Sequence, residues 1–257
     1  MNKHAKPGLS EGTLHEQLSD DSKPAFARYQ DLALGSSNIA YLIKYELIIL
    51  FSSWVPGAIG LVLRKSLYPF ILGKVGKNVI FGQGVAIRHG EKVNIGSGVI
   101  IDDGAVLDAK GGSNTGISIG DNTIVSRNVV ISCKNGDISV GSGCTIGINT
   151  LIHAMEGSDV SIGDNVLIGA FSYFIGSGPY GTESLELPFK KQGMFPQGGI
   201  TIADNVWFGS NVQILDGVEI GSGSIIGAST VVNKNVGDYD VVAGVPMKLL
   251  KNRQQSD

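Results

Sequence analysis

Cysteine is scarce in this sequence, and basic residues do not outnumber acidic ones. The 257 residues include two cysteines, Cys133 and Cys144, and no CxxC pair, which argues against a disulfide framework or a cysteine-based zinc site. Only 17% of the residues are charged and the net charge is −3, so no basic surface for nucleic acid is expected. The first 24 residues contain no apolar core of a signal peptide. These features predict a cytoplasmic protein with reduced thiols, no metal site and no nucleic-acid partner.

Long hydrophobic runs are also absent. The most apolar stretch, Leu47 to Leu63, has 17 consecutive uncharged residues and is interrupted by Pro56, Gly57 and Gly60. A membrane-spanning helix needs about 20 apolar residues, and a central Pro-Gly pair breaks a helix. Residues 31–74 are therefore predicted to form an apolar helical hairpin.

This hairpin has three interpretations. In the first, residues 38–72 lie on the surface of an anionic membrane, with Trp54 and Tyr68 near the headgroups and cations on the flanks. Those cations are Lys44, Arg64, Lys65 and Lys74. In the second, the hairpin packs on the rest of the protein or on a sister subunit, and in the third it spans the membrane. Residues 1–30, which precede it, are polar and are expected to form a flexible tail.

Glycine, by contrast, is abundant, with 37 residues, and accompanies a six-residue repeat that begins at Val75. Each hexad opens with an aliphatic or aromatic residue, and these openers group into seven triplets. The triplets are Val75, Phe81, Ile87; Ile95, Ile101, Leu107; Ile119, Val125, Ile131; Val140, Ile146, Ile152; Ile162, Ile168, Phe174; Ile202, Phe208, Ile214; and Ile220, Ile226, Val232. Four residues after each of the first two openers of a triplet stands a small or β-branched residue. These are Val79, Val85, Val99, Ala105, Thr123, Val129, Cys144, Thr150, Val166, Ser172, Val206, Val212, Ser224 and Thr230.

A large and a small inward side chain in each hexad describe a short strand followed by a corner. Three such strands close a triangular coil, and successive coils stack as parallel strands about 4.8 Å apart. The predicted fold is an all-β repeat, a parallel β-helix of about seven triangular coils over residues 75–236. The helical hairpin precedes it, and a C-terminal extension, 237–257, is expected to contain a short helix. The pattern resembles the hexapeptide-repeat acyltransferase family, and this resemblance implies that the β-helix is left-handed.

One long insertion interrupts the repeat. A coil takes 18 residues, but the coils that start at Ile162 and Ile202 begin 40 residues apart. The surplus predicts a long loop at residues 176–200 that leaves the β-helix after Phe174. Because long loops on rigid scaffolds usually carry function, Tyr180, Glu183 and Glu186 are candidate substrate-binding residues. The alternative for both carboxylates is ordinary solvated charge.

The segment from Asn205 to Lys251 resembles the C-terminal half of the maltose, galactoside and xenobiotic O-acetyltransferases and of exopolysaccharide O-acetyltransferases. In that family acetyl-coenzyme A (acetyl-CoA) lies between adjacent prisms of a trimer, so the resemblance implies a homotrimer with acetyl-CoA as acyl donor. Carried over by motif, Trp207 lines the active-site wall and the backbone N–H of Ser210 receives the oxyanion. The resemblance also implies a set of cofactor-binding positions. They are Ala228, beside the pantetheine arm, and Lys234, Lys248 and Lys251, near the phosphates.

The catalytic histidine of that family is missing. Acyl transfer to a hydroxyl at neutral pH needs a base, and the maltose and galactoside enzymes have a histidine five residues after the last opener before the long loop. Here that position is Pro179. His153 follows the opener Ile152, which is expected beneath Phe174, so it is the candidate catalytic base; a substrate contact and a structural corner residue are its other interpretations. His89 lies four coils below Phe174, about 19 Å away, too far to share that centre.

The predicted function is transfer of an acyl group, expected to be acetyl, from acetyl-CoA to a hydroxyl of a saccharide. The apolar hairpin suggests a lipid-linked or surface-polysaccharide intermediate as acceptor, and hence a cytoplasmic protein at the inner face of the membrane. Two alternatives stay open. One is N-acetylation of a nucleotide-linked amino sugar, because a free amine needs less help from a base. The other is a catalytically inactive trimeric scaffold.

Overall fold

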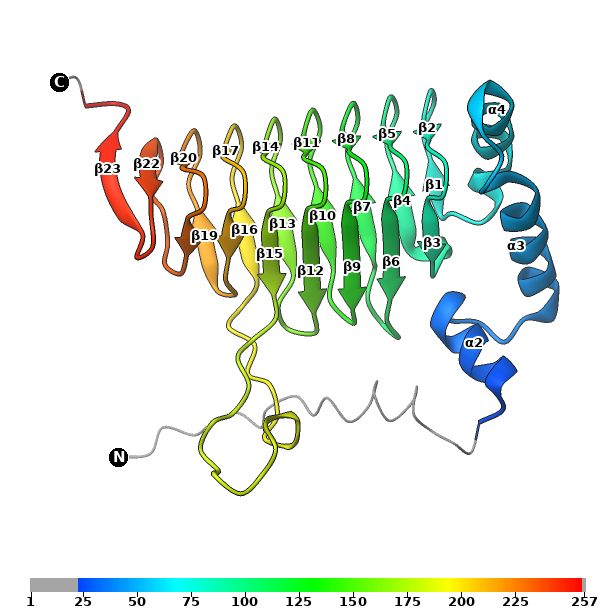
Figure 1. The fold of residues 1–257 in the computed structure, drawn as a ribbon, viewed down its shortest axis with the longest axis horizontal. Helices are drawn as coiled ribbons and strands as arrows, with labels where there is room; N and C mark the ends of the chain where they lie inside the picture. Colours follow the sequence, from blue (N-terminus) through cyan, green and yellow to red (C-terminus); the bar gives the residue numbers. More distant parts are fainter. Residues whose placement is uncertain (1–22, 256–257) are drawn as a thin grey trace.

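The computed structural model describes residues 23–255, and most of them form one triangular column of stacked strands (Figure 1). Three sheets run along the column. Sheet 1 consists of β1 (Lys74–Val75), β4 (Val93–Ile95), β7 (Ile117–Ile119), β10 (Ile138–Val140), β13 (Val160–Ile162), β16 (Ile200–Ile202) and β19 (Val218–Ile220). Sheet 2 contains β2 (Ile80–Phe81), β5 (Ile100–Ile101), β8 (Ile124–Val125), β11 (Thr145–Ile146), β14 (Leu167–Ile168), β17 (Trp207–Phe208) and β20 (Ile225–Ile226). Sheet 3 consists of β3 (Ala86–Arg88), β6 (Val106–Lys110), β9 (Val130–Lys134), β12 (Leu151–Met155), β15 (Tyr173–Gly176), β18 (Gln213–Ile214) and β21 (Val231–Val232).

The register of these sheets confirms the predicted parallel β-helix of seven triangular coils. Openers pair with openers along each side, as in the parallel pairs Val75 with Ile95 and Phe81 with Ile101. Every opener after Val75 is buried, and so are all the small residues of the second inward position. Two inward aromatic rings, those of Phe174 and Phe208 in successive coils, pack with their centroids 5.2 Å apart. Strands of two to five residues suffice because the column buries both inward side chains of a hexad.

The corners account for the abundance of glycine and asparagine. The residue before a small inward residue often has a positive φ, as at Gly104 (φ 69°) before Ala105 and Asn128 (φ 57°) before Val129. Glycine and asparagine adopt this left-handed conformation at low cost. Phe171 (φ 59°) is an exposed exception at the corner between β14 and β15.

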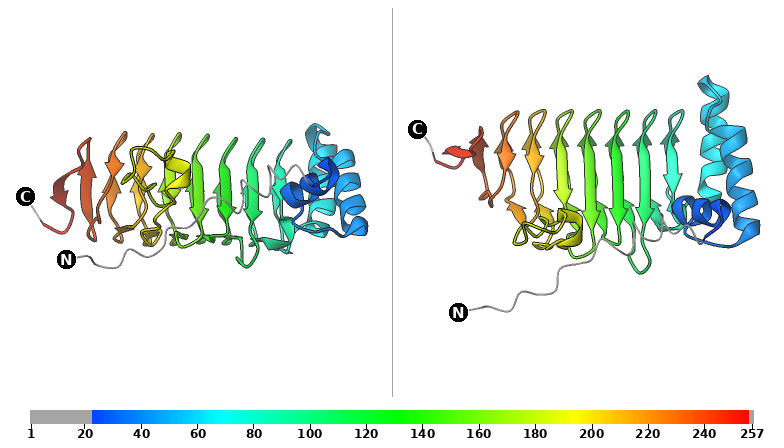
Figure 2. Two further views of the ribbon diagram at one scale, coloured as in Figure 1. Left: turned by 90° about the horizontal axis from the view of Figure 1, so that it is seen from below. Right: turned by 60° about the horizontal axis from the view of Figure 1, so that its bottom comes forward.

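Three helices close the N-terminal end of the column (Figure 1, Figure 2). They are α2 (Ala25–Ala33), α3 (Ile39–Ser52) and α4 (Gly57–Leu67), followed by the short 3₁₀ helix η1 (Tyr68–Phe70), and we call residues 25–70 the helical cap. The pair α3–α4 is the predicted hairpin, broken at Pro56. Helix α2 begins inside the segment expected to be a tail, so that expectation is wrong for residues 25–30; the backbone N–H of His89 donates to Ala33 O at 2.9 Å and holds α2 on the first coil. The rest of the expected tail, residues 1–22, lies outside the described residues.

Arg64 fastens the hairpin to the first coil. Its side chain is 1% exposed and donates to Phe81 O (2.9 Å), Ser52 O (3.0 Å) and Val55 O (2.7 Å). Tyr68 is fully buried with its ring edge-on to that of Phe81 at 5.2 Å. Arg64 and Tyr68 therefore face the column, and the prediction that they lie near lipid headgroups is wrong. The reason is that the carbonyls at the C-terminus of α3 and beside it attract a cation.

The hairpin thus packs on the rest of the protein through one of its faces, as its second interpretation held. No helix among the described residues is long and apolar enough to cross a bilayer. That finding removes the membrane span from the interpretations of α3 and α4.

The C-terminal extension contains strands where a short helix was expected. Strand β22 (Asp240–Ala243) joins sheet 2 in parallel with β20, and a bridge from Val236 to Ile220 continues sheet 1, so an incomplete eighth coil extends the solenoid past residue 236. Strand β23 (Lys248–Asn252) then returns antiparallel to β22. The predicted helix is wrong because the open edge of β22 offers backbone partners to the segment that follows it.

The predicted long loop leaves β15 and rejoins the column at β16, and we call residues 177–199 the excursion. It projects sideways from the column (Figure 1). Its tip contains η3 (Phe189–Lys191), and the side chain of Gln192 bonds Ser184 N, Ser184 O and Leu187 O. The remaining 3₁₀ turn, η2 (Gly90–Lys92), connects β3 to β4.

Candidate functional site

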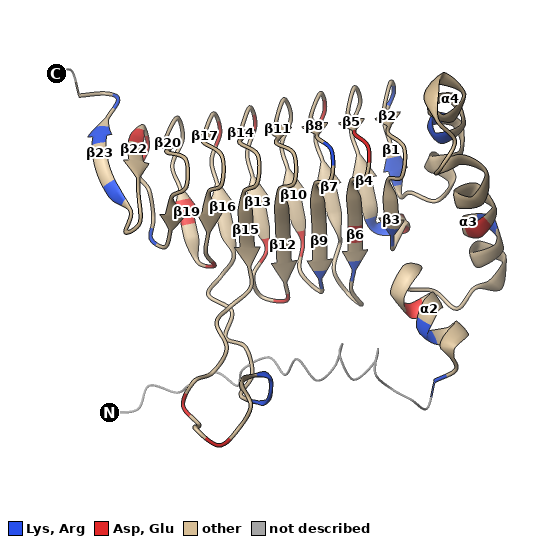
Figure 3. Ribbon diagram, viewed as in Figure 1, with Lys and Arg blue, Asp and Glu red and all other residues tan. Residues whose placement is uncertain are grey.

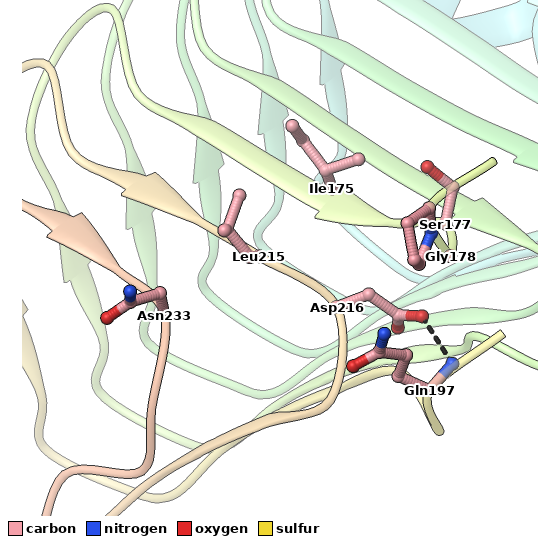
Figure 4. Close-up of a pocket in the computed structure, with 8 residues that line it drawn as sticks. Ile175, Ser177, Gly178, Gln197, Leu215, Asp216 and Asn233 are labelled. Carbon is pink, nitrogen blue, oxygen red and sulfur yellow. Dashed lines mark hydrogen bonds between the residues drawn. The ribbon is translucent and has the colours of Figure 1, made fainter. Parts of the chain in front are cut away.

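A cavity of about 380 Å³ lies where the excursion meets sheet 3 (Figure 4). Its apolar lining comes from positions directly after two strand openers, Ile175 and Leu215. Its remaining lining residues are Ser177, Gly178, Pro179, Gln197, Asp216 and Asn233. A concave site with an apolar wall and several convergent polar groups is the usual form of a small-molecule site. The cavity also contains Pro179, the position at which the family histidine is missing.

Asp216 holds the root of the excursion in place. Its carboxylate accepts hydrogen bonds from Gln197 N (2.6 Å), Gly199 N (2.8 Å) and Ser158 Oγ (2.7 Å), and Figure 4 shows the bond to Gln197. Bonds to an ionised acceptor are stronger than neutral ones. One side chain thus ties both the end of the excursion and the turn after β12 to the end of β18, which gives the cavity a fixed floor.

His153 lies on the outer face of sheet 3, one rung from the cavity. In β12 the side chains of Ile152 and Ala154 are buried, so the half-buried His153 between them turns outward. It pairs in register with the cavity residue Ile175, and adjacent rungs are about 4.8 Å apart. His153 is not itself a lining residue, but its imidazole can reach the cavity wall.

Burial lowers the pKa of His153 below its ordinary value, and the Lys134 ammonium lowers it further. The backbone of Ser132 and the carboxylate of Asp108 act in the opposite direction and are smaller effects. The imidazole is therefore neutral at pH 7, which is the state that a general base needs.

Trp207, Ser210 and Ala228 occupy a different part of the surface. Trp207 is half exposed on sheet 2, and Ser210 and Ala228 are exposed in successive coils at the corner between sheets 2 and 3. No hydrogen bond from the backbone N–H of Ser210 or Ala228 occurs within the described part of the chain. Both donors are thus free, as the family roles of an oxyanion donor and a pantetheine contact require.

One chain does not bring this corner and His153 together. Ser210 is in the sixth coil and His153 in the fourth, so they are about 10 Å apart along the column alone. They are also offset along the strands of sheet 3, because Ser210 precedes β18 whereas His153 is the middle residue of β12. A single reaction centre that uses both needs residues from two chains.

The three candidate lysines are exposed at the C-terminal end of the column. Lys234 follows β21, and Lys248 and Lys251 lie on β23. Tyr180, Glu183 and Glu186 are exposed on the excursion, where Tyr180 pairs with Met194 through a backbone bridge. The structure thus puts Tyr180 and both carboxylates beyond the cavity wall, with none of the three among its lining residues.

His89 and the two cysteines have structural surroundings. His89 is 6% exposed, its Nε2 lies 3.1 Å from Asp31 O of α2, and burial lowers its pKa. Burial raises the pKa of the Cys133 thiol to about 12 and also raises that of Cys144. Both thiols are buried and protonated, so neither is a nucleophile. Within residues 23–255 no three His, Cys, Asp or Glu side chains gather as metal ligands would.

Sequence reasoning missed the polar residues of the cavity, above all Asp216, Gln197 and Asn233. Asp216 and Asn233 stand close behind the openers Ile214 and Val232, at the corner where the coils of sheet 3 meet the excursion. The available signal was this position in the coil: residues one or two places after the third opener lie beside the root of the insertion.

Two family models match the repeat. The model described as "Bacterial transferase hexapeptide (six repeats)" matches residues 199–234, and "Hexapeptide repeat of succinyl-transferase" matches residues 159–178. Among curated proteins, the galactoside O-acetyltransferase of Escherichia coli is 33% identical over 140 residues, 54% of this chain and 66% of that protein. A probable acetyltransferase of Mycobacterium tuberculosis is 32% identical over 126 residues, 49% of this chain and 41% of that protein. The chain thus spans between two-fifths and two-thirds of these relatives.

Among solved structures, the fold resembles AntD, an N-acyltransferase from Bacillus cereus in complex with dTDP and 3-hydroxybutyryl-CoA. The TM-score is 0.53 and the identity 20%, with 79% of this chain and 91% of that chain covered. The likeness at this identity concerns the fold. The coils, their hexad register and the matching repeat models together identify the chain as a member of the bacterial hexapeptide-repeat transferase family.

Proposed function

We propose that this protein transfers an acetyl group from acetyl-CoA to a hydroxyl of a saccharide, with His153 as general base. The observation that carries the proposal is the neutral, half-buried imidazole of His153, one rung from a cavity with polar groups at the root of the excursion. His153 would accept the proton of the acceptor hydroxyl as its oxygen attacks the thioester carbonyl. When the C–S bond breaks, the imidazolium would return that proton to the CoA thiolate.

The other candidate residues have parts in the same proposal. The free backbone N–H of Ser210 would stabilise the oxyanion, and Trp207 would form the wall beside it. Ala228 would contact the pantetheine arm. The lysines Lys234, Lys248 and Lys251 would face the phosphates of acetyl-CoA, and Tyr180, Glu183 and Glu186 would contact the saccharide as the excursion closes on it. Support for the lysines comes from their exposure on the coils nearest Ala228.

A homotrimer is part of the proposal, because Ser210 and His153 are too far apart in one chain to act on one thioester. Three prisms side by side would set the corner of one chain against sheet 3 of the next. We expect light scattering on the purified protein to give about three times the chain mass of 26.9 kDa. A stable monomer with full activity would contradict a shared site.

N-acylation of an amino sugar is the second candidate, and Pro179 favours it, since an amine attacks a thioester with less help from a base. AntD, which shares the fold, is itself an N-acyltransferase. Assays with acetyl-CoA and matched pairs of hydroxyl and amino sugars should show turnover with a hydroxyl acceptor. Turnover with the amino member alone would replace the first proposal with the second.

The same assay tests the scaffold alternative. Calorimetry should detect binding of CoA to the protein, and absence of both CoA binding and turnover would leave a catalytically inactive trimer. We also propose a cytoplasmic location with a lipid-linked acceptor, which the free thiols of Cys133 and Cys144 and the apolar helical cap support.

A further inference from the structure

Helix α3 is apolar on the side that faces away from the column as well as on the side that packs against it. The packed side buries Tyr41, Leu42, Tyr45 and Ile48. The outward side is a continuous stripe at helical spacing, and α4 adds two more exposed residues. We call these seven residues the outer cap surface: Ile39, Ile43, Leu47, Leu50, Trp54, Ile59 and Val62, each 49% exposed or more. A helix that is apolar all round is normally covered on all sides, so this surface lacks a partner in the isolated chain.

Basic residues outnumber acidic ones in α3, α4 and the first corner of the column behind them, although the chain as a whole is acidic. Residues 38–77 contain five basic residues and one acidic residue, a net charge of +4, whereas the whole chain has a net charge of −3. Arg64 is buried, and the other four, Lys44, Lys65, Lys74 and Lys77, are exposed. The single acid, Glu46, accepts a hydrogen bond from the hydroxyl of Tyr29. Figure 3 shows how few charged positions α3 and α4 carry.

We propose that the outer cap surface binds the surface of an anionic lipid membrane. An apolar stripe that includes a tryptophan, with lysines at its edge, is the pattern of a helix that lies in the headgroup region. Anionic lipid complements the lysines, and their attraction falls off within a Debye length. A second copy is the less favourable partner, because two caps face to face bring like charges together. Helix α3, with 14 residues, would lie on the membrane rather than cross it.

Membrane contact through the cap has a consequence for the acceptor, which rests on the proposed function. The cap covers the first coil, and the cavity is bounded by Ile175 of the fifth. Four rungs, about 19 Å, separate these coils, and the layer of cap helices adds about 10 Å. With the column standing on the membrane, a lipid-linked acceptor would have to extend about 30 Å from the headgroups, which fits a chain of several sugars better than a single sugar on its lipid.

Vesicle sedimentation with the full chain tests membrane binding without any turnover. The probe is vesicles of phosphatidylcholine and phosphatidylglycerol in equal parts, with phosphatidylcholine alone for comparison. The wild type should sediment with the anionic vesicles and lose that binding as salt rises. The double variant Ile43→Gln, Leu47→Gln should lower the partition coefficient about tenfold or more, because it removes two exposed apolar side chains and no charge.

The matched control is Leu185→Gln, the same change at a fully exposed residue of the excursion, which should bind vesicles as the wild type does. The double variant should still acetylate a soluble acceptor, so failure of membrane binding and failure of the proposed activity are distinguishable. Equal sedimentation of the double variant and the wild type would overturn the proposal. So would a wild type that ignores vesicles and instead doubles its mass through the cap.

Discussion

Replacing His153 with alanine is expected to lower turnover by about 10²-fold or more, the usual effect of removing a general base. Burial and Lys134 lower the pKa of the half-buried imidazole. The other outward side chains of β12, Leu151 and Met155, have no titratable group that could replace it. The KM for acetyl-CoA should change little, since the proposed role of His153 is to accept the proton of the acceptor hydroxyl, whereas the proposed CoA contacts are Ala228 and the three lysines. Steady-state kinetics on the purified variant measures both quantities.

Met155→Ala is the matched control for His153. Met155 is half-buried on the same strand and the same outer face, two residues further on, and carries no proton. It should keep turnover within a few-fold of the wild type. If His153→Ala is as active as the control in a folded protein, His153 is not the base.

The pH profile gives an independent check of the same assignment. A base works in its neutral form, so activity should fall as the pH drops through the pKa of His153. Because that pKa is lowered, the acidic limb of kcat/KM should lie below the ordinary histidine value of about 6.5. A limb well above that value would point to another group.

Replacing Arg64 with alanine is expected to have the largest effect on stability. It would leave the carbonyls of Ser52, Val55 and Phe81 without their buried donor and open a cavity between α4 and β2. Losses of this kind cost about 3 to 5 kcal/mol. Since each coil of a solenoid contacts only its neighbours, the loss should appear as faster hydrogen exchange in α3 and α4, with β13 to β21 unchanged.

The neighbouring Lys65 provides the comparison. It carries the same charge on the same helix but is exposed, so Lys65→Ala should stay within about 0.5 kcal/mol of the wild type. Unchanged exchange in α3 and α4 of the Arg64 variant would show that the three bonds do not hold the cap.

The solenoid was predictable nearly to the residue because its signal repeats. Each opener from Val75 to Val232 reports the same inward position, so local ambiguity averages out over the column, and the pairs of the three sheets join opener to opener. The excursion was predictable for the same reason, because it interrupts the regular six-residue repeat. Its bounds lie within a residue of the ends of β15 and β16.

Features that do not repeat along the sequence were not predicted. The sequence around Arg64 reads as the flank of an apolar hairpin, and nothing local shows that its guanidinium turns inward to three carbonyls. The C-terminal strands escaped notice because β23 forms only against the edge of β22, a partner that pattern reading does not supply. The cavity has the same origin: Asp216 and Gln197 are 19 residues apart and meet only once the excursion folds back.

The antiparallel β23 also determines where the column stops. A stack of parallel coils ends in a row of free backbone groups that would accept a further coil from any neighbour, and growth by that route makes fibres. Here the final strand, β23, pairs antiparallel with β22 and exposes Lys248 and Lys251, while helices cover the opposite end of the column. The column therefore does not grow by adding coils from neighbouring molecules, and its length stays finite.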